Sequence, residues 1–173
     1  LPRHIVAYPA GDRLLTSASS SLHEDPPAAE QRRPDAPLQV LFVGNVIPRK
    51  GLHTVIAALA LAQAPIHLSV VGSQSADPQY AERLHTQVRE ANLGECVIFL
   101  DVLADDELAL LYARCDILAA PSYEGFGIVY LEAMAYGHPV IASTTGAARE
   151  IVTAGDNGFL VAPGDAEALA RYL

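Results

Sequence analysis

The chain has 173 residues, of which 51% are hydrophobic, and a formal net charge of −9 at pH 7. This length and apolar content suffice for the core of one domain, and the absence of a basic stripe disfavours a nucleic-acid-binding protein. The two cysteines and six histidines lack the spacing of a metal site, so we expect no metal ion.

The first 37 residues differ from the rest of the chain. Residues 4–8 are apolar enough for a short strand, and residues 16–37 are rich in Ser, Pro, Glu and Arg. This composition predicts an incoming strand and a linker over residues 1–37, followed by one folded domain over residues 38–173. The chain opens without methionine and shows no signal peptide, so we expect a fragment of a longer protein that acts in the cytoplasm or at the cytoplasmic face of a membrane.

From residue 38 onward, strand-like and helix-like patterns alternate. The predicted strands are residues 38–44, 66–71, 97–100, 116–120, 139–142 and 158–161. The predicted helices begin near residues 52, 78, 105, 128, 147 and 165, and the fourth has Ile128, Leu131, Met134 and Ala135 on one face. This alternation predicts right-handed crossovers and a parallel sheet covered on both faces, which is a doubly wound, Rossmann-like α/β domain.

One apolar run, residues 55–72, is long enough to suggest a membrane span. Gln63, Pro65 and His67 interrupt this run, and a proline would break a spanning helix. We therefore interpret the run as the end of one helix and a strand, and we expect no membrane-spanning segment.

The strand–loop–helix stretch over residues 122–136 carries the clearest functional signal. Gly125 and Gly127 let backbone N–H groups approach a ligand closely, and a helix start favours an anion such as phosphate. Glu124 lies in the loop, while Glu132 lies among apolar helix residues, where a carboxylate is costly without a polar partner such as a sugar diol. Either glutamate alone could be a cap or a solvated side chain, but the pair around a glycine loop favours a binding site.

A second signal follows the first strand, at Arg49 and Lys50, the only lysine of the chain. The helix dipole disfavours basic residues at a helix start unless an anion is bound there. Doubly wound sheets bind ligands where the strand order reverses, and the first and fourth strands flank that point. We therefore expect the loops over residues 44–51 and 121–127 to face each other, and Lys50, Arg49 and both glutamates to form one site.

Two common nucleotide motifs do not fit. Gly125-Phe-Gly127 is followed by Tyr130 where a dinucleotide fingerprint needs a third small residue, so NAD is disfavoured. Lys50 lacks the preceding glycine and the following Ser or Thr of a P-loop.

Five motifs in order resemble those of the retaining glycosyltransferases of family four. They are Gly44-Asn-Val-Ile-Pro-Arg-Lys-Gly51, Val70-Val-Gly72, Asp105-Asp-Glu-Leu108, Pro121-Ser-Tyr-Glu-Gly-Phe-Gly127 with Glu132, and Gly137-His-Pro-Val-Ile-Ala-Ser143. The resemblance covers about residues 38–173 and implies the C-terminal, nucleotide-sugar-binding half of a GT-B enzyme. Such an enzyme would move a sugar from a nucleotide diphosphate sugar to an acceptor glycan or lipid, which a missing N-terminal domain would bind.

The resemblance also implies roles for single residues. Glu124 and Glu132 form the family's E-x7-E motif, in which Glu132 would hold the donor ribose and Glu124 would face the transferred sugar. Lys50 would bind the diphosphate in place of a metal and stabilise the leaving group, so no cofactor is implied. The implied catalytic residues are Glu124 and Lys50, and the implied donor-binding residues are Gly44, Asn45, Arg49, Lys50, Gly72, Asp101, Val102, Gly125, Phe126, Gly127, Ile128 and Glu132.

Two positions depart from the family's pattern. Asn45 stands where the family commonly has arginine, so one phosphate contact is missing unless Arg49 replaces it. Asp101 stands where the family often has glycine, near the nucleotide base. Because a carboxylate can accept hydrogen bonds from the N–H groups of guanine, we expect GDP to bind better than UDP.

Two other functions stay open at this point. A nucleotide-sugar epimerase could use the same half-fold and the paired carboxylates for acid–base chemistry. The other function is that of a non-catalytic module that binds nucleotide sugars or a protein. In the glycosyltransferase interpretation, we expect this fragment alone to bind the donor without turnover.

Overall fold

The computed structural model describes residues 36–173, so the strand and linker expected before residue 36 lie outside it. The strands are β1 (Leu38–Val43), β2 (Ile66–Val71), β3 (Val97–Phe99), β4 (Ile117–Ala120), β5 (Val140–Ser143) and β6 (Gly158–Val161). The helices are the short 3-10 helix η1 (Pro48–Lys50), α2 (Leu52–Leu61), α3 (Pro78–Glu90), α4 (Asp105–Arg114), α5 (Ile128–Ala135), α6 (Ala148–Ile151) and α7 (Ala166–Ala170). All six predicted strands and all six predicted helices are present, with ends that differ by one or two residues.

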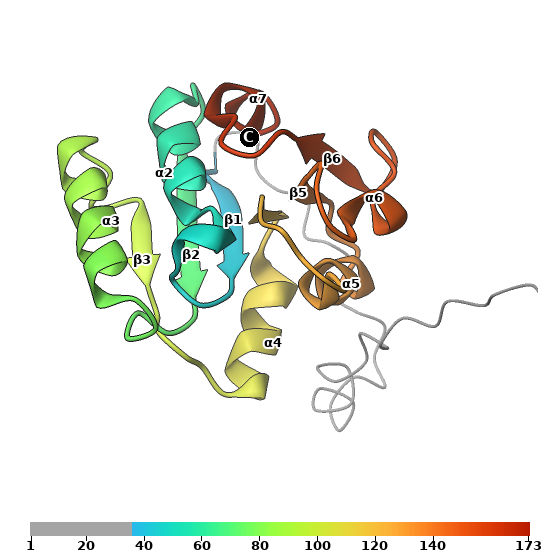
Figure 1. Cartoon of the computed structure of the whole chain (residues 1–173), viewed down its shortest axis with the longest axis horizontal. Helices are drawn as coiled ribbons and strands as arrows, with labels where there is room; N and C mark the ends of the chain where they lie inside the picture. Colours follow the sequence, from blue (N-terminus) through green and yellow to red (C-terminus); the bar gives the residue numbers. More distant parts are fainter. Residues whose placement is uncertain (1–35) are drawn as a thin grey trace, which may run out of the picture.

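The six strands form one parallel sheet in the order β3-β2-β1-β4-β5-β6. The order therefore runs outward in both directions from the β1–β4 pair, where Val40 lies beside Ile117. Figure 1 shows helices on both sides of this sheet. The predicted doubly wound, Rossmann-like fold is confirmed, and the strand order reverses between the two predicted strands.

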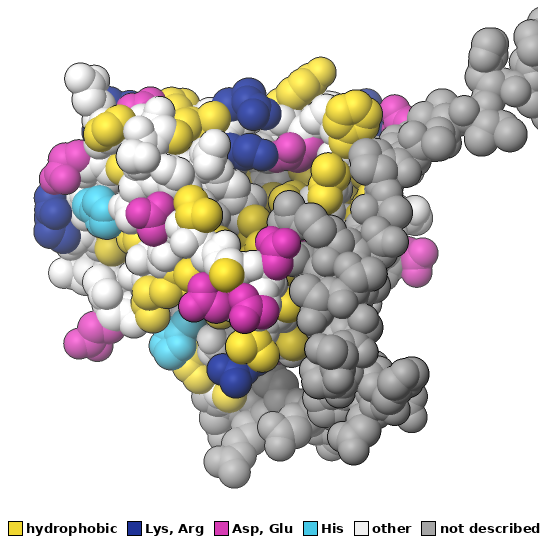
Figure 2. Space-filling view, turned by 90° about the horizontal axis from the view of Figure 1, so that it is seen from below, with side chains coloured by type: hydrophobic (Ala, Val, Ile, Leu, Met, Phe, Trp, Pro, Cys, Tyr) yellow, Lys and Arg dark blue, Asp and Glu magenta, His cyan; other side chains and the backbone are white. Residues whose placement is uncertain are grey.

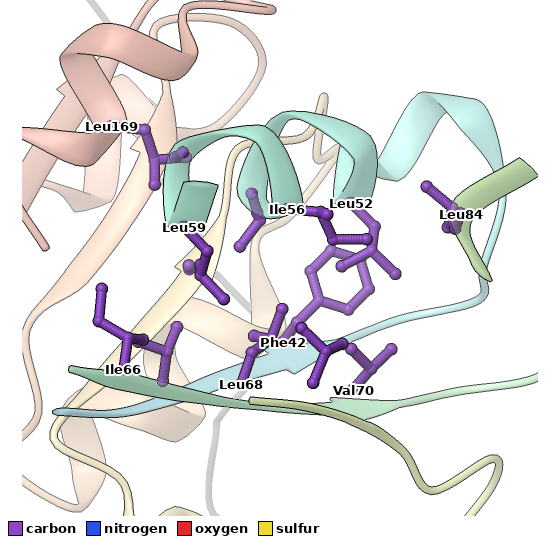
Figure 3. Packing of buried hydrophobic residues seen from close by; sticks show 14 of the residues in the cluster. Phe42, Leu52, Ile56, Leu59, Ile66, Leu68, Val70, Leu84 and Leu169 are labelled. Atoms are coloured by element: carbon purple, nitrogen blue, oxygen red, sulfur yellow. The ribbon is translucent and has the colours of Figure 1, made fainter. Parts of the chain in front are cut away.

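Successive residues of the central strands feed two separate cores. Phe42 points to the face covered by α2, α3 and α7, where it packs with Leu52, Ile56 and Leu84 (Figure 3). Its neighbour Leu41 belongs to the opposite core, under α4, α5 and α6. Because strands buried on both faces need apolar side chains, β4 and the Val40–Val43 part of β1 appear in the sequence as continuous apolar runs. Truncating a core residue such as Phe42 to alanine typically costs about 3–5 kcal/mol.

Helix α5 packs on a different face from the one expected. The sequence suggested a face with Ile128, Leu131, Met134 and Ala135, but Ile128 and Ala135 are exposed, and Leu131 and Met134 are only half-buried. The buried residues are Tyr130, Ala133 and Glu132. Every residue of α5 except Glu132 is apolar, so its periodicity does not single out one face.

Two helices begin directly after an aspartate that caps them. Asp165 caps α7 by accepting a hydrogen bond from the amide of Ala168 at 2.8 Å, as the sequence predicted. Asp77 caps α3 in the same way through the amide of Tyr80. Within residues 36–173, no helix combines the length and the apolar content needed to cross a membrane.

Candidate active site

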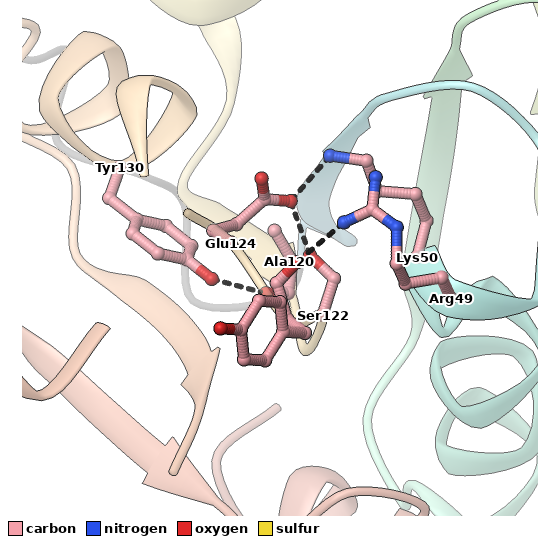
Figure 4. A network of polar contacts seen from close by, with 7 residues as sticks. Arg49, Lys50, Ala120, Ser122, Glu124 and Tyr130 are labelled. Carbon is pink, nitrogen blue, oxygen red and sulfur yellow. Dashed lines mark hydrogen bonds and ion pairs between the residues drawn. The ribbon is translucent and has the colours of Figure 1, made fainter. Parts of the chain in front are cut away.

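The loops that follow β1 and β4 meet at the point where the strand order reverses. Lys50 Nζ lies 2.5 Å from Glu124 Oε1, and Arg49 Nη1 donates a hydrogen bond of 2.6 Å to the carbonyl of Tyr123 (Figure 4). Each contact joins residues 74 positions apart in the sequence. The structure thus brings Arg49, Lys50 and Glu124 together across the crossover of the parallel sheet.

Figure 2 looks onto the carboxyl ends of the strands, where this site lies. Lys and Arg side chains lie beside acidic ones on this face. The first turn of α4 carries three acidic residues, Asp105 to Glu107. In the part of the chain that the structure describes, no group of His, Cys, Asp and Glu side chains is arranged to hold a metal ion.

Glycines shape the loop that carries Lys50. The Lys50 stem lies against Gly44, since a Cβ on that glycine would be 3.2 Å from Lys50 Cε. Gly72 approaches even more closely, because a Cβ there would lie 2.1 Å from the carbonyl oxygen of Gly44. Any side chain at Gly72 would push the β1 loop out of place. Packing therefore requires glycine at position 72, whereas at position 44 a Cβ would meet only the flexible Lys50 side chain and the φ of 150° favours glycine.

Glu124 is held by two donors on one carboxylate oxygen. Lys50 Nζ and the hydroxyl of Ser122, at 2.6 Å, both bond to its Oε1. The ammonium and carboxylate side chains are only 15% and 14% exposed. Screening by water is therefore weaker than at an open surface, and this ion pair contributes more than a fully exposed one. Sequence reasoning assigned no role to Ser122, although it stands inside the motif.

Tyr130 fixes the helix that follows the Glu124 loop. Its hydroxyl donates a hydrogen bond of 3.0 Å to the carbonyl of Ala120, at the end of β4. Burial, and then the nearby charge of Glu124, raise the pKa of Tyr130, so the phenol stays protonated. Gly127 leaves room for this ring, because a Cβ on it would lie 2.6 Å from a Tyr130 ring carbon. The position of α5 is thus tied to β4.

The other residues of this loop form an open rim. Phe126 is 60% exposed, and Ile128 is exposed beside it. Tyr123 is exposed as well, and its carbonyl accepts the Arg49 hydrogen bond, a contact that sequence reasoning missed. No described atom lies within 4 Å of a Cβ built on Gly125, so packing does not require glycine there.

Glu132 lies in a different environment from Glu124. It is 4% exposed, and its Oε2 accepts a hydrogen bond of 3.0 Å from the Tyr112 hydroxyl on α4. Burial and the charge of Glu132 raise the pKa of Tyr112, and the Tyr136 ring stacks on the Tyr112 ring. The structure therefore places Glu132 beside Tyr112, between α4 and α5. Nothing in the spacing of the sequence pointed to Tyr112.

Asp101 lies two residues after the end of β3, on the same edge of the sheet. Its backbone is left-handed, with φ at 57°, and its carbonyl accepts a hydrogen bond of 2.7 Å from the amide of Gly72. One carboxylate oxygen accepts the amide of Val102 at 3.0 Å, and both residues are exposed. Asn45 is exposed at the end of β1. The carboxyl ends of β3, β2 and β1 thus present Asp101, Gly72 and Gly44 side by side.

Comparison with known families and proteins identifies relatives of this chain. The profile of the family described as glycosyl transferases group 1 matches residues 26–173. A D-inositol 3-phosphate glycosyltransferase of Stackebrandtia nassauensis is 35% identical over 137 residues, which are 74% of this chain and 31% of that protein. A glycogen synthase of Mycobacterium tuberculosis is 34% identical over 83% of this chain and 35% of that protein. The chain thus spans about a third of the length of the curated relatives that it matches.

Solved structures share both the fold and part of the sequence. Anabaena HepE, in complex with UDP and glucose, is 37% identical with a TM-score of 0.74 over 78% of this chain and 37% of that one. Sucrose-phosphate synthase of Thermosynechococcus elongatus is 35% identical with a TM-score of 0.72 over 95% of this chain and 39% of that one. The C-terminal domain of a group 1 protein from Francisella tularensis is 31% identical, with a TM-score of 0.71 over 78% of this chain and 72% of that one.

Proposed function

The chain belongs to the group 1 glycosyl transferases, and on that basis we propose that residues 38–173 bind the nucleotide diphosphate sugar from which a retaining glycosyltransferase takes the transferred sugar. The observation that carries this proposal is the Lys50–Glu124 pair, which stands where a doubly wound sheet binds its ligand. The complex of the similar HepE with UDP and glucose supports a nucleotide sugar as the ligand.

Lys50 would act on the diphosphate. Breaking the bond between the sugar and the diphosphate leaves negative charge on the departing oxygens, and a fixed cation beside them lowers the barrier. Its ammonium is held in place by Glu124 and by the packing of its stem on Gly44. Arg49 supplies a second positive charge on the same turn. Because Lys50 and Arg49 offer this charge, we propose that the step needs neither a metal ion nor a cofactor.

Glu124 would face the sugar. The transition state of glycosyl transfer carries positive charge on the reacting carbon and its ring oxygen, and a carboxylate nearby stabilises that charge. When a diphosphate binds Lys50, the Glu124 carboxylate would lose its ion-pair partner. The carboxylate could then stabilise the positive charge on the sugar. Ser122 would still hold the carboxylate in position through its hydroxyl.

Glu132 would hold the ribose. A buried carboxylate is stable only when its oxygens accept hydrogen bonds, and Tyr112 supplies one of these. Ribose hydroxyls are donors of the required kind. Asp101 and Val102 would then lie toward the base, two strands from Lys50 along the same edge of the sheet.

The acceptor would bind outside this chain. We propose a glycan or a lipid acceptor, held by an N-terminal domain that the described residues do not include. Binding of the donor without turnover is therefore the expected behaviour of this chain. The proposal keeps the cytoplasm, or the cytoplasmic face of a membrane, as the place of action that the sequence suggested.

Calorimetric titration of the chain with UDP, GDP, UDP-glucose, GDP-mannose and NAD tests the proposal. We expect at least one nucleoside diphosphate to bind, NAD not to bind, and Lys50→Ala to weaken binding by at least tenfold. Arg171→Ala is the matched control, because Arg171 is an exposed cation at the end of α7. Equal affinity of the Lys50→Ala variant, or no binding of any of these nucleotides, would contradict the proposed function.

A further inference from the structure

We propose that Gly146, in the turn between β5 and α6, is a positioning residue that holds Glu124 against Lys50. No candidate site residue from the sequence lies in this turn. Its importance for catalysis depends on the proposed function, in which Glu124 acts on the sugar. Its effect on the Lys50–Glu124 pair depends only on the described contacts.

The backbone of Gly146 touches the backbone of Glu124. The two residues form a parallel β-bridge, which extends the pairing of β4 and β5 beyond the ends of both strands. The next amide, that of Ala147, donates a hydrogen bond of 2.8 Å to the carbonyl of Glu124. Glu124 is thus anchored twice, through its carboxylate by Lys50 and Ser122, and through its main chain by this turn.

A side chain at position 146 would collide with this backbone. A Cβ on Gly146 would lie 2.4 Å from the carbonyl oxygen of Glu124 and 3.0 Å from its nitrogen. Both atoms belong to the main chain, so they cannot turn aside as the end of a flexible side chain can. The φ of Gly146 is 70°, in the left-handed region that glycine adopts readily. Close approach and backbone conformation both require glycine here.

The Glu124 loop would yield to such a collision rather than the turn. Ser143 is buried, and its hydroxyl bonds to the hydroxyl of Thr145 at 2.8 Å, while the amide of Thr144 donates to the carbonyl of Val161. On the other side, Gly125 has no described atom within 4 Å of its Cβ position, and Phe126 is exposed. The loop therefore has space to move, and its displacement carries the Glu124 carboxylate away from Lys50.

A small displacement is enough to matter. Misplacing a reacting group by about 1 Å can cost about a hundredfold in rate. Glycine at position 146 is therefore as necessary for the reaction as the Glu124 carboxylate itself. Gly146 nevertheless touches neither the donor nor Lys50 in the proposed mechanism.

The single lysine of the chain allows a direct test. With lysine labelled with ¹³C at Cε and ¹⁵N at Nζ, the protein gives one side-chain signal, that of Lys50. We expect the signal in Gly146→Ala to move most of the way to its position in Glu124→Gln, where the ion pair is lost. Gly155→Ala is the control, because Gly155 also has a positive φ, 84°, but no described atom lies within 4 Å of its Cβ position. An unchanged Lys50 signal in Gly146→Ala would overturn the inference.

A second variant covers the case in which Gly146→Ala does not fold. Ala147→Pro removes the amide that bonds to the Glu124 carbonyl, and the φ of Ala147, −71°, is one that proline adopts. We expect the Lys50 signal to shift in the same direction as in Glu124→Gln. An unchanged signal in the Ala147→Pro protein would count equally against the proposal.

Donor binding then separates positioning from a general loss of structure. We expect Gly146→Ala to reduce the ratio of UDP-glucose to UDP affinity, or of GDP-mannose to GDP affinity, by at least fivefold, and Gly155→Ala to keep it. Adding Gly146→Ala to Glu124→Gln should change the ratio by less than twofold, because both act on one carboxylate. An unchanged ratio in Gly146→Ala would contradict positioning. If the wild-type chain binds no nucleotide, the proposed function is wrong, and the Lys50 signal still decides this inference.

Discussion

Lys50 Nζ and Glu124 Oε1 lie 2.5 Å apart and join two loops that are 74 residues apart in the sequence. The proposed mechanism needs Lys50 and Glu124 to act on different parts of the donor, although the two side chains bind each other in the structure. In the proposed mechanism Lys50 binds the diphosphate, yet without a ligand its charge is neutralised by the carboxylate that should face the sugar. A nucleotide that binds Lys50 would therefore compete with Glu124 for the ammonium.

Glu124→Gln should for this reason strengthen the binding of a nucleoside diphosphate without sugar. The neutral amide competes less for Lys50. Removing an ion pair of this kind changes the free energy of nucleotide binding by about 1 kcal/mol, which is about threefold to tenfold in affinity. The gain should be absent for the sugar nucleotide, which loses its contact with the carboxylate. Calorimetric titration with UDP, GDP and their sugar derivatives measures both effects.

The chain offers a control for this substitution. Glu82 pairs with Arg89 at 3.5 Å on the exposed face of α3, where the two side chains are 73% and 64% exposed. Glu82→Gln makes the same chemical change away from the site and should leave every nucleotide affinity within twofold. Weaker binding of both nucleoside diphosphates by the Glu124→Gln protein would show that Glu124 does not compete for Lys50.

The meeting of these two loops could be predicted from the sequence because topology determines it. Apolar runs identify the strands, their alternation with helices implies a parallel sheet, and a doubly wound sheet brings the ends of its first and fourth strands together. Lys50 and Glu124 each follow one of these strands. No side-chain detail was needed to place them at one edge.

The contacts made by Glu132 and Gly146 could not be predicted in the same way. Tyr112 meets Glu132 because α4 and α5 pack side by side on one face of the sheet, and the residues at a helix contact depend on the rotation of each helix. Since α5 is almost entirely apolar, its sequence did not fix that rotation. Gly146 is required by a backbone approach of less than 3 Å, which no periodicity records.

Tyr112→Phe should destabilise the protein by about 1–3 kcal/mol. The substitution removes the donor of the hydrogen bond to Glu132 and leaves a buried carboxylate oxygen without this partner. Urea unfolding measures the change in the free energy of unfolding. Tyr172→Phe removes a hydroxyl from a partly exposed ring and should stay within about 0.5 kcal/mol of the wild type. Equal stability of the Tyr112→Phe and Tyr172→Phe proteins would contradict the importance of this bond.

The role proposed for Glu132 predicts selectivity for ribose. A carboxylate that accepts both ribose hydroxyls loses one bond when the 2′-hydroxyl is absent, so the nucleoside diphosphate should bind better than its 2′-deoxy form. Glu132→Ala should remove that preference, and Tyr112→Phe should reduce it, because Tyr112 orients the carboxylate. Titration with UDP and dUDP, or GDP and dGDP, checks this. Unchanged selectivity in Glu132→Ala would favour a module that does not recognise the donor through this residue.

Alkaline pH should destabilise the fold through Cys115. Burial, and then the charge of Asp116, raise the pKa of this thiol from 9.0 to about 12. Between these values the unfolded chain has lost a proton that the folded chain keeps, so the free energy of unfolding falls as pH rises. One such group contributes up to about 1.4 kcal/mol per pH unit.

Cys115→Ala should therefore flatten the loss of stability between pH 9 and 12. Urea unfolding under reducing conditions, at pH steps across this range, gives the slope. Cys96→Ala is the control, since Cys96 is only partly buried, and it should keep the wild-type slope. Parallel pH profiles for the wild type and the Cys115→Ala protein would refute the assignment, whatever constant offset the lost sulfur produces.

Asp101→Gly should raise the free energy of unfolding and abolish the preference for GDP over UDP. The left-handed φ of 57° is unfavourable for an aspartate and natural for glycine, so the variant should gain up to about 1 kcal/mol in the free energy of unfolding. The same change removes the exposed carboxylate expected to accept the N–H groups of guanine, so the preference for GDP over UDP should disappear. Asn92→Gly is the control, because Asn92 has a φ of 56° at the end of α3 and should gain stability without affecting either nucleotide. Stronger stabilisation of the wild-type chain by UDP than by GDP in a thermal-shift comparison would show that Asp101 does not select guanine.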